Sequence, residues 1–87
     1  MRESLIEKKI CDHAKATGWL VFKCTGHKGI PDRILHKDGK TLYIEMKRPG
    51  GKLSKLQQIT IKRLNDHGIP AVVVYSVQEG IDFIDSH

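Results

Sequence analysis

The dipeptide Asp38-Gly39 constrains the fold more strongly than any other feature of this sequence. It tolerates the positive φ angles of a tight hairpin turn. It also separates two runs of strand-forming residues, 30–37 and 41–47, and so predicts a β-hairpin. In a two-residue loop Lys37 pairs with Lys40. Each further pair lies one residue outward on both strands, so the two residue numbers of every pair have the same sum. The turn therefore sets the register of the whole hairpin.

This register places Asp32 opposite Glu45. Opposed residues of a ladder have Cβ atoms roughly 4.5–5.5 Å apart on one face of the sheet, where two like charges repel. A cation between the carboxylates removes that repulsion, and Mg²⁺ and Mn²⁺ prefer such hard oxygen ligands. Strand alternation puts Lys47 on the same face as Glu45. The hairpin therefore predicts a divalent-metal site suited to phosphodiester hydrolysis, in which Lys47 stabilises the developing charge.

The rest of the chain predicts an α/β fold, a mixed sheet flanked by helices in the order α-β-β-β-α-β-α. Capping boxes at Ser54 with Gln57 and at Ser76 with Glu79 mark two helix starts. A helical crossover between the third and fourth strands permits parallel pairing. The expected segments besides the hairpin are a helix over 4–17, a largely buried strand over 19–24, a helix over 54–66, an interior strand over 71–75 and a short helix over 76–84. We expect Trp19, Phe22 and Tyr75 to pack in the core.

The chain of 87 residues, 39% of them hydrophobic, provides for one modest core, which predicts a single domain over residues 1–87. A core of this size gains order from a partner subunit, so we expect a homodimer. The formal net charge of +5 favours an anionic partner such as nucleic acid. Lys28, Arg48, Lys52 and Lys55 are the expected phosphate contacts, and the alternative for them is a solvated surface.

Two cysteines, Cys11 and Cys24, show neither metal-ligand spacing nor a disulfide framework. We expect both to be buried thiols in a reducing compartment. The sequence contains no apolar stretch of membrane-spanning length, and its first residues do not form a signal sequence. The expectation is a soluble cytoplasmic protein of a bacterial or phage-infected cell.

The same residues resemble a family pattern. Pro31-Asp32 followed by Glu45-Met46-Lys47 is similar to the bipartite PD-(D/E)XK nuclease signature. The wider runs 29–33, 45–54 and 56–57 resemble the VRR-Nuc (virus-type replication-repair nuclease) branch across nearly the whole chain. The resemblance implies a restriction-endonuclease-like fold and a divalent-metal-dependent DNA endonuclease. Small stand-alone members of that branch are similar to homodimeric Holliday-junction resolvases of phages and bacteria.

The resemblance also implies roles for individual residues. Asp32 and Glu45 would be catalytic residues that bind the metal together with the Met46 backbone carbonyl. Lys47 would be catalytic, and Gln57 would lie near the site and take part in catalysis.

The family further places an acidic residue on the first helix, where Glu3 and Glu7 lie one turn apart and share a face. We favour Glu7 as a catalytic residue, because a rigid helix interior can aim it, whereas Glu3 lies where the terminus frays.

Each of these interpretations has a plainer alternative. Asp32 and Glu45 could be solvated acids at strand ends, and Gln57 could serve only as the capping partner of Ser54. His27 could contact DNA or assist proton transfer, and the plainer alternative is that it does neither. The chain as a whole could be a non-catalytic nucleic-acid-binding module, or a nuclease subunit that needs a partner.

Overall fold

The computed structural model describes residues 1–26 and 28–87, so the question about His27 lies outside the described residues. Seven elements appear in the predicted order α-β-β-β-α-β-α. They are α1 (Glu3–Ala16), β1 (Leu20–Lys23), β2 (Arg33–Lys37), β3 (Lys40–Met46), α2 (Lys55–Asp66), β4 (Ala71–Val74) and α3 (Val77–Asp85). The α/β fold expected from the sequence is therefore confirmed.

The four strands form one mixed sheet in the order β1-β2-β3-β4. The hairpin has the predicted register, with pairs running from Lys37 and Lys40 to Arg33 and Ile44. Asp38 and Gly39 take φ angles of 50° and 78°, the positive values that the turn requires. The strands β3 and β4 are parallel, as the helical crossover through α2 allows.

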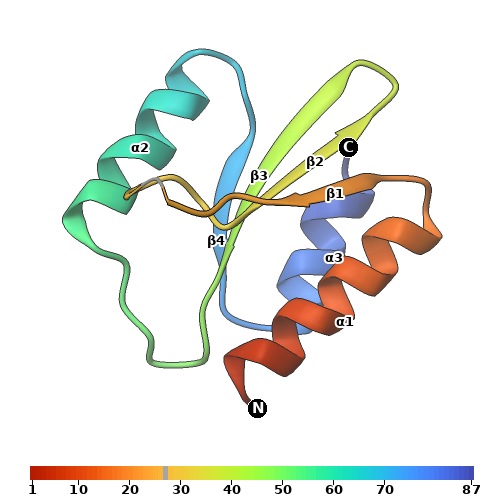
Figure 1. Ribbon diagram of the computed structural model, residues 1–87, viewed down its shortest axis with the longest axis horizontal. Coiled ribbons are helices and arrows are strands. Elements are labelled where there is room, and N and C mark those ends of the chain that lie inside the picture. Colours follow the sequence, from red (N-terminus) through yellow and green to blue (C-terminus); the bar gives the residue numbers. More distant parts are fainter. Residues whose placement is uncertain (27) are drawn as a thin grey trace.

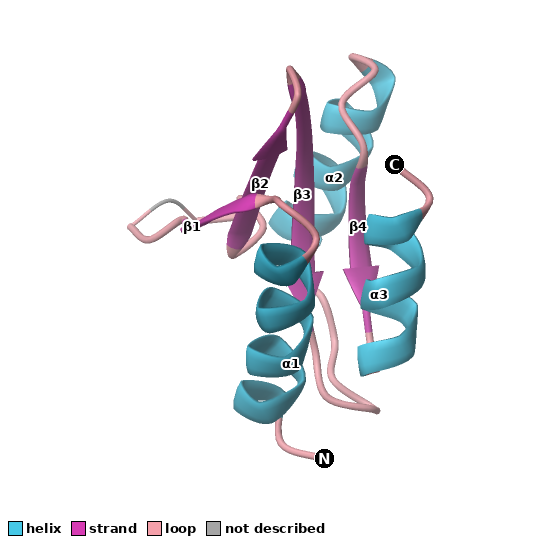
Figure 2. Ribbon diagram, turned by 90° about the vertical axis from the view of Figure 1, so that its right-hand side faces the viewer, coloured by secondary structure: helices cyan, strands magenta, loops and turns pink. Residues whose placement is uncertain are grey.

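Helices α1 and α3 cover one face of the sheet, and α2 lies on the other face beside β4 (Figures 1 and 2). The two covering helices approach closely at Gly80, where an added Cβ would come within 2.4 Å of Cδ1 of Ile10. The hydrophobic core lies between these helices and the sheet. Its members are Ile6, Ile10, Cys11, Ala14, Trp19, Leu35, Leu42, Ile44, Met46, Val74 and Ile84.

The outer strands differ from the sequence prediction. The strand β1 was expected to be largely buried, yet Leu20 is 62% exposed and Phe22 is 53% exposed. The reason is that α1 and α3 cover only the opposite face, while α2 packs on β4 and leaves the β1 side open. Phe22 is therefore not a core residue, whereas Trp19 is. The strand β4 lies at the second edge of the sheet, and the expectation of an interior strand was wrong.

Within the part of the chain that the structure describes, no helix combines the length and apolar character needed to cross a membrane.

Candidate functional site

Three carboxylates from distant parts of the chain converge at one end of the sheet. Glu3 lies in the first turn of α1, Asp32 directly precedes β2, and Glu45 lies near the end of β3. One oxygen of each lies within 4.8 Å of the others. We call Glu3, Asp32 and Glu45 the acidic cluster. So close a group of negative charges is costly without a compensating cation.

Glu45 is the most constrained member of the acidic cluster, since it is only 1% exposed. Its Oε1 accepts a hydrogen bond from the Asp32 backbone N–H at 3.1 Å, and its Oε2 lies 3.3 Å from Nζ of Lys47. Burial, together with the negative charge of Asp32, raises the pKa of the Glu45 carboxyl, while Lys47 and the Asp32 N–H act against that rise. A bound cation would relieve the cost of keeping this carboxylate ionised.

Asp32 is positioned by a loop that presses against α2. Its backbone oxygen accepts a hydrogen bond from the Cys24 N–H at 2.7 Å, which extends the β1–β2 ladder by one pair. Gly29 comes so close to α2 that an added Cβ would lie 2.5 Å from Cγ of Leu56. Gly29 also has a φ of +84°, which residues with a side chain rarely adopt. Glycine is therefore required three residues before the cluster acid.

Lys47 and Met46 follow Glu45 on opposite sides of the strand. The Lys47 N–H donates to the Val74 carbonyl at 2.9 Å, so the parallel ladder holds the lysine just beyond the end of β3. The Met46 side chain is buried in the core, as alternation requires. The lysine ammonium therefore lies beside the acidic cluster, and the role of the Met46 carbonyl as a ligand stays a prediction.

Gln57 forms the predicted capping box at the start of α2. Its Oε1 accepts from the Ser54 N–H at 3.0 Å, and the Ser54 hydroxyl accepts from the Gln57 N–H at 3.1 Å. The structural role of Gln57 is thus established by its contacts. A catalytic role for it stays a prediction.

The acid that α1 contributes to the acidic cluster is Glu3, and not the favoured Glu7. The Glu7 carboxylate instead accepts from Nε of Arg33 at 2.7 Å. Arg33 follows Asp32, and alternation turns its side chain toward α1 while Asp32 faces the other way. Arg33 was not among the residues predicted for the site, although this alternation is a signal in the sequence that points to Arg33 as the partner of an acid on α1.

The four expected phosphate contacts, Lys28, Arg48, Lys52 and Lys55, are all exposed. Arg48 and Lys52 lie in the segment that connects Lys47 to α2, so three basic side chains follow the acidic cluster along the chain. Their arrangement is compatible with contacts to a phosphate backbone beside the cluster.

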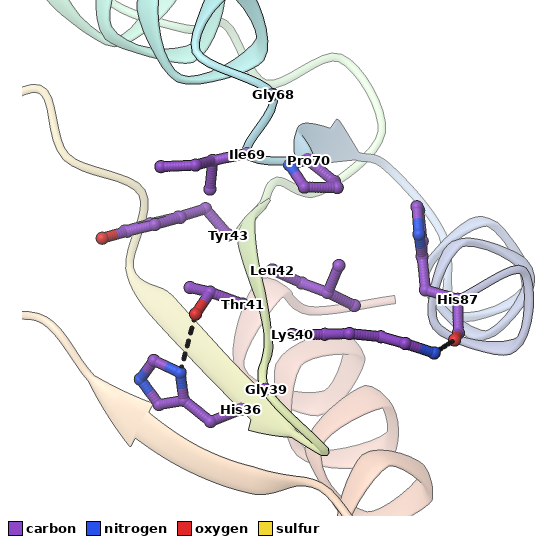
Figure 3. Close-up of a pocket in the computed structure, with 10 residues that line it drawn as sticks. All are labelled: His36, Gly39, Lys40, Thr41, Leu42, Tyr43, Gly68, Ile69, Pro70 and His87. Carbon is purple, nitrogen blue, oxygen red and sulfur yellow. Dashed lines mark hydrogen bonds between the residues drawn. The ribbon is translucent and has the colours of Figure 1, made fainter.

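A cavity of about 590 Å³ lies away from this site, beside the start of β3 and the Gly68–Pro70 turn (Figure 3). Three of its polar side chains have partners: His36 is 3.0 Å from the Thr41 hydroxyl, and Lys40 donates to the His87 backbone oxygen. None of the acidic cluster lines it. The full lining is His36, Gly39, Lys40, Thr41, Leu42, Tyr43, Gly68, Ile69, Pro70 and His87.

Comparison with known proteins gives a consistent result. The sequence model of the VRR-NUC domain family matches residues 4–78. A solved structure described as a VRR_NUC domain superposes with a TM-score of 0.85 at 23% identity, covering 100% of this chain and 98% of the other. That likeness shows a shared fold. None of the curated proteins matches the chain.

Proposed function

Because the chain belongs to the VRR-NUC family, which implies nuclease activity, we propose that it is a divalent-metal-dependent DNA endonuclease that hydrolyses phosphodiester bonds. The observation that carries the proposal is the convergence of Glu3, Asp32 and Glu45 beside Lys47. A hydrolase for a polyanion needs positive charge at the scissile phosphate. The acidic cluster would hold a cation, and Lys47 contributes a further positive charge.

The donor set fits Mg²⁺ or Mn²⁺, because all three side chains offer hard oxygen ligands from separate elements. Asp32 and Glu45 would hold the ion, with the Met46 backbone carbonyl as a further ligand and Glu3 in the position first expected for Glu7. When bound, such a cation orients the phosphate and activates water for attack. The buried Glu45 keeps its oxygens fixed through the hydrogen bond from Asp32.

Lys47 has the geometry of a residue that stabilises the transition state. Its ammonium lies 3.3 Å from Glu45 and retains partial access to solvent. A phosphodiester at the acidic cluster would come within reach of this ammonium, which would then stabilise charge developing on the phosphate oxygens. Gln57 would act from the start of α2, and Lys28, Arg48, Lys52 and Lys55 would contact the flanking phosphates.

We also propose a homodimer acting on branched DNA such as a Holliday junction. The support is physical: the single core is small, and the exposed apolar side chains of Leu20 and Phe22 are available for burial against another subunit. Two sites related by a two-fold axis suit a branched substrate with matching symmetry. The mass of the protein in solution, measured by light scattering, tests the dimer separately from the chemistry.

Cleavage of labelled linear duplex, flapped and four-way-junction DNA tests the function. Wild type is compared with Glu45→Ala and with Asp66→Asn, which removes a carboxylate at the far end of α2. We expect cleavage with Mn²⁺ or Mg²⁺ that EDTA and Glu45→Ala abolish and Asp66→Asn leaves unchanged. Metal-independent DNA binding without any cleavage would instead identify a binding module, and activity that appears only with a second protein would identify a partner-dependent subunit.

A further inference from the structure

An ion pair between Glu7 and Arg33 lies next to the acidic cluster without belonging to it. Nε of Arg33 donates a hydrogen bond to one Glu7 carboxylate oxygen at 2.7 Å, and Nη2 lies 2.5 Å from the same oxygen as an ion pair. The two side chains are 22% and 19% exposed, so the pair is largely shielded from water. Two contacts from a planar, rigid guanidinium to one oxygen define the relative position of the groups better than a single ammonium could.

The position of this pair connects it to two members of the acidic cluster. Glu7 lies one helical turn after Glu3 on the same side of α1, and Arg33 directly follows Asp32. Among residues 1–26 and 28–87, it is the one side-chain ion pair that joins α1 to the sheet. The pair therefore sets where the start of α1 lies relative to the segment that carries Asp32.

The start of α1 has few other constraints. Arg2, the residue before the helix, provides no side-chain cap, and Leu5 is partly exposed. Ile6 is the first buried residue of the helix. An uncapped first turn frays readily, because its N–H groups have no partners within the helix. Something beyond helix propensity must hold Glu3 in place.

We propose that Glu7 and Arg33 are positioning residues that hold the Glu3 carboxylate against Asp32 and Glu45 and thereby set the affinity of the acidic cluster for a divalent cation. The inference rests on the proposed function, since it requires the cluster to bind a metal. Without the pair, the first turn of α1 moves more freely. The conformational entropy that Glu3 then loses on becoming ordered opposes metal binding. Outer residues that orient metal ligands have effects of this kind.

For one variant, simple electrostatics and the positioning role predict opposite changes in the affinity for a divalent cation. Arg33→Gln removes a positive charge close to the acidic cluster, so electrostatics alone predicts tighter binding of a cation. Positioning predicts weaker binding, because the contact that anchors α1 is lost. Glu7→Gln weakens binding under either account, which makes Arg33→Gln the decisive variant.

The experiment measures Mn²⁺ binding by calorimetry and by the electron paramagnetic resonance signal of free Mn²⁺. We expect Glu7→Gln and Arg33→Gln each to weaken binding about 10-fold, and the double variant to be no weaker than the weaker single one. Amide hydrogen exchange over residues 3–9, measured without metal, should quicken in both single variants. The matched control is Asp85→Asn, which removes the 2.7 Å contact between His13 at the other end of α1 and Asp85 on α3. It should change neither readout.

Unchanged or tighter Mn²⁺ binding in Arg33→Gln, or unchanged exchange at the start of α1, would overturn the inference. If Arg33→Gln does not fold, Arg33→Lys replaces it. Mn²⁺ binding equal to wild type in Arg33→Lys would likewise overturn the inference. Glu45→Ala separates the two proposals. If wild type binds no Mn²⁺, or Glu45→Ala binds it equally well, the proposed metal site fails and this inference with it. If Glu45→Ala abolishes binding while the Glu7 and Arg33 variants match wild type, only the positioning role fails.

Discussion

The two faces of the sheet are packed very differently. On the side of α1 and α3, Ile6, Ile10 and Ile84 are at most 1% exposed, and the two helices touch through Gly80. On the side of α2 the helix contributes no buried residue, and Ile59 remains 45% exposed. The first face supplies the burial that stabilises the fold, whereas the side chains of α2 on the second face remain largely in contact with solvent.

The strand β3 connects the two faces of the sheet, because its successive side chains point alternately to one face and to the other. Ile44 and Met46 point into the core, while Glu45 between them points to the other face and joins the acidic cluster. The well-packed side thus gives a carboxylate on the other side a rigid backbone. The geometry of the acidic cluster therefore depends on the core on the opposite face of the sheet.

The largest expected effect is a loss of unfolding free energy when the core on the α1 and α3 face is changed. Ile10→Ala creates a cavity under Gly80 and should lower the free energy of unfolding by about 2–5 kcal/mol. Ile59→Ala on α2 should lower it by less than about 1 kcal/mol, because the side chain is already partly hydrated. Urea denaturation followed by circular dichroism measures both, and equal losses would show that the faces share the stabilisation.

Metal addition should stabilise the protein through the acidic cluster. Mn²⁺ at about 100 times its dissociation constant adds about 2.7 kcal/mol to the free energy of unfolding, and EDTA removes that gain. Glu45→Gln, which keeps the shape of the side chain, should show no gain in a thermal melt. An equal Mn²⁺-induced shift in wild type and Glu45→Gln would place the metal elsewhere.

Gly29→Ala tests a tight contact on the α2 side. The substitution combines a φ of +84° with a Cβ placed 2.5 Å from Cγ of Leu56, so we expect a loss of about 1–3 kcal/mol. Adding Leu56→Ala should restore part of that loss by removing the clash, while the backbone strain persists. No recovery in the double variant would mean that the φ angle accounts for the whole effect.

The smallest expected effect concerns Cys11 and Cys24, whose thiol reactivity reports on the burial of each side chain. Cys11 lies on the buried face of α1, and this burial raises the pKa of its thiol, with Arg33 opposing the rise and Glu7 adding to it. Cys24 is only half-buried. Iodoacetamide should therefore modify Cys24 in the folded protein and spare Cys11, as peptide mass spectrometry would show. The modified protein should differ from wild type by less than about 0.5 kcal/mol in unfolding free energy, and rapid loss of both thiols would contradict the packing of α1.

Much of the fold was accessible from local signals. The Asp38-Gly39 turn and the capping box at Ser54 rest on contacts between residues close in the sequence, and the structure has both. The expected burial of β1 and the interior place of β4 were wrong, because an apolar run looks the same whether one face or both faces of a strand are covered.

The hairpin register follows from the amino-acid sequence alone, because a two-residue turn and a period of two leave one pairing, which ends at Arg33 and Ile44 and brings Asp32 beside Glu45. The convergence of Glu3, rather than Glu7, with these carboxylates depends on how the helix packs on the sheet, as does the pairing of Glu7 with Arg33. Helical periodicity shows that Glu3 and Glu7 share a face, but not how far along the sheet the helix lies. That position is set by long-range packing, including the contact of Ile10 with Gly80, between residues far apart in the chain.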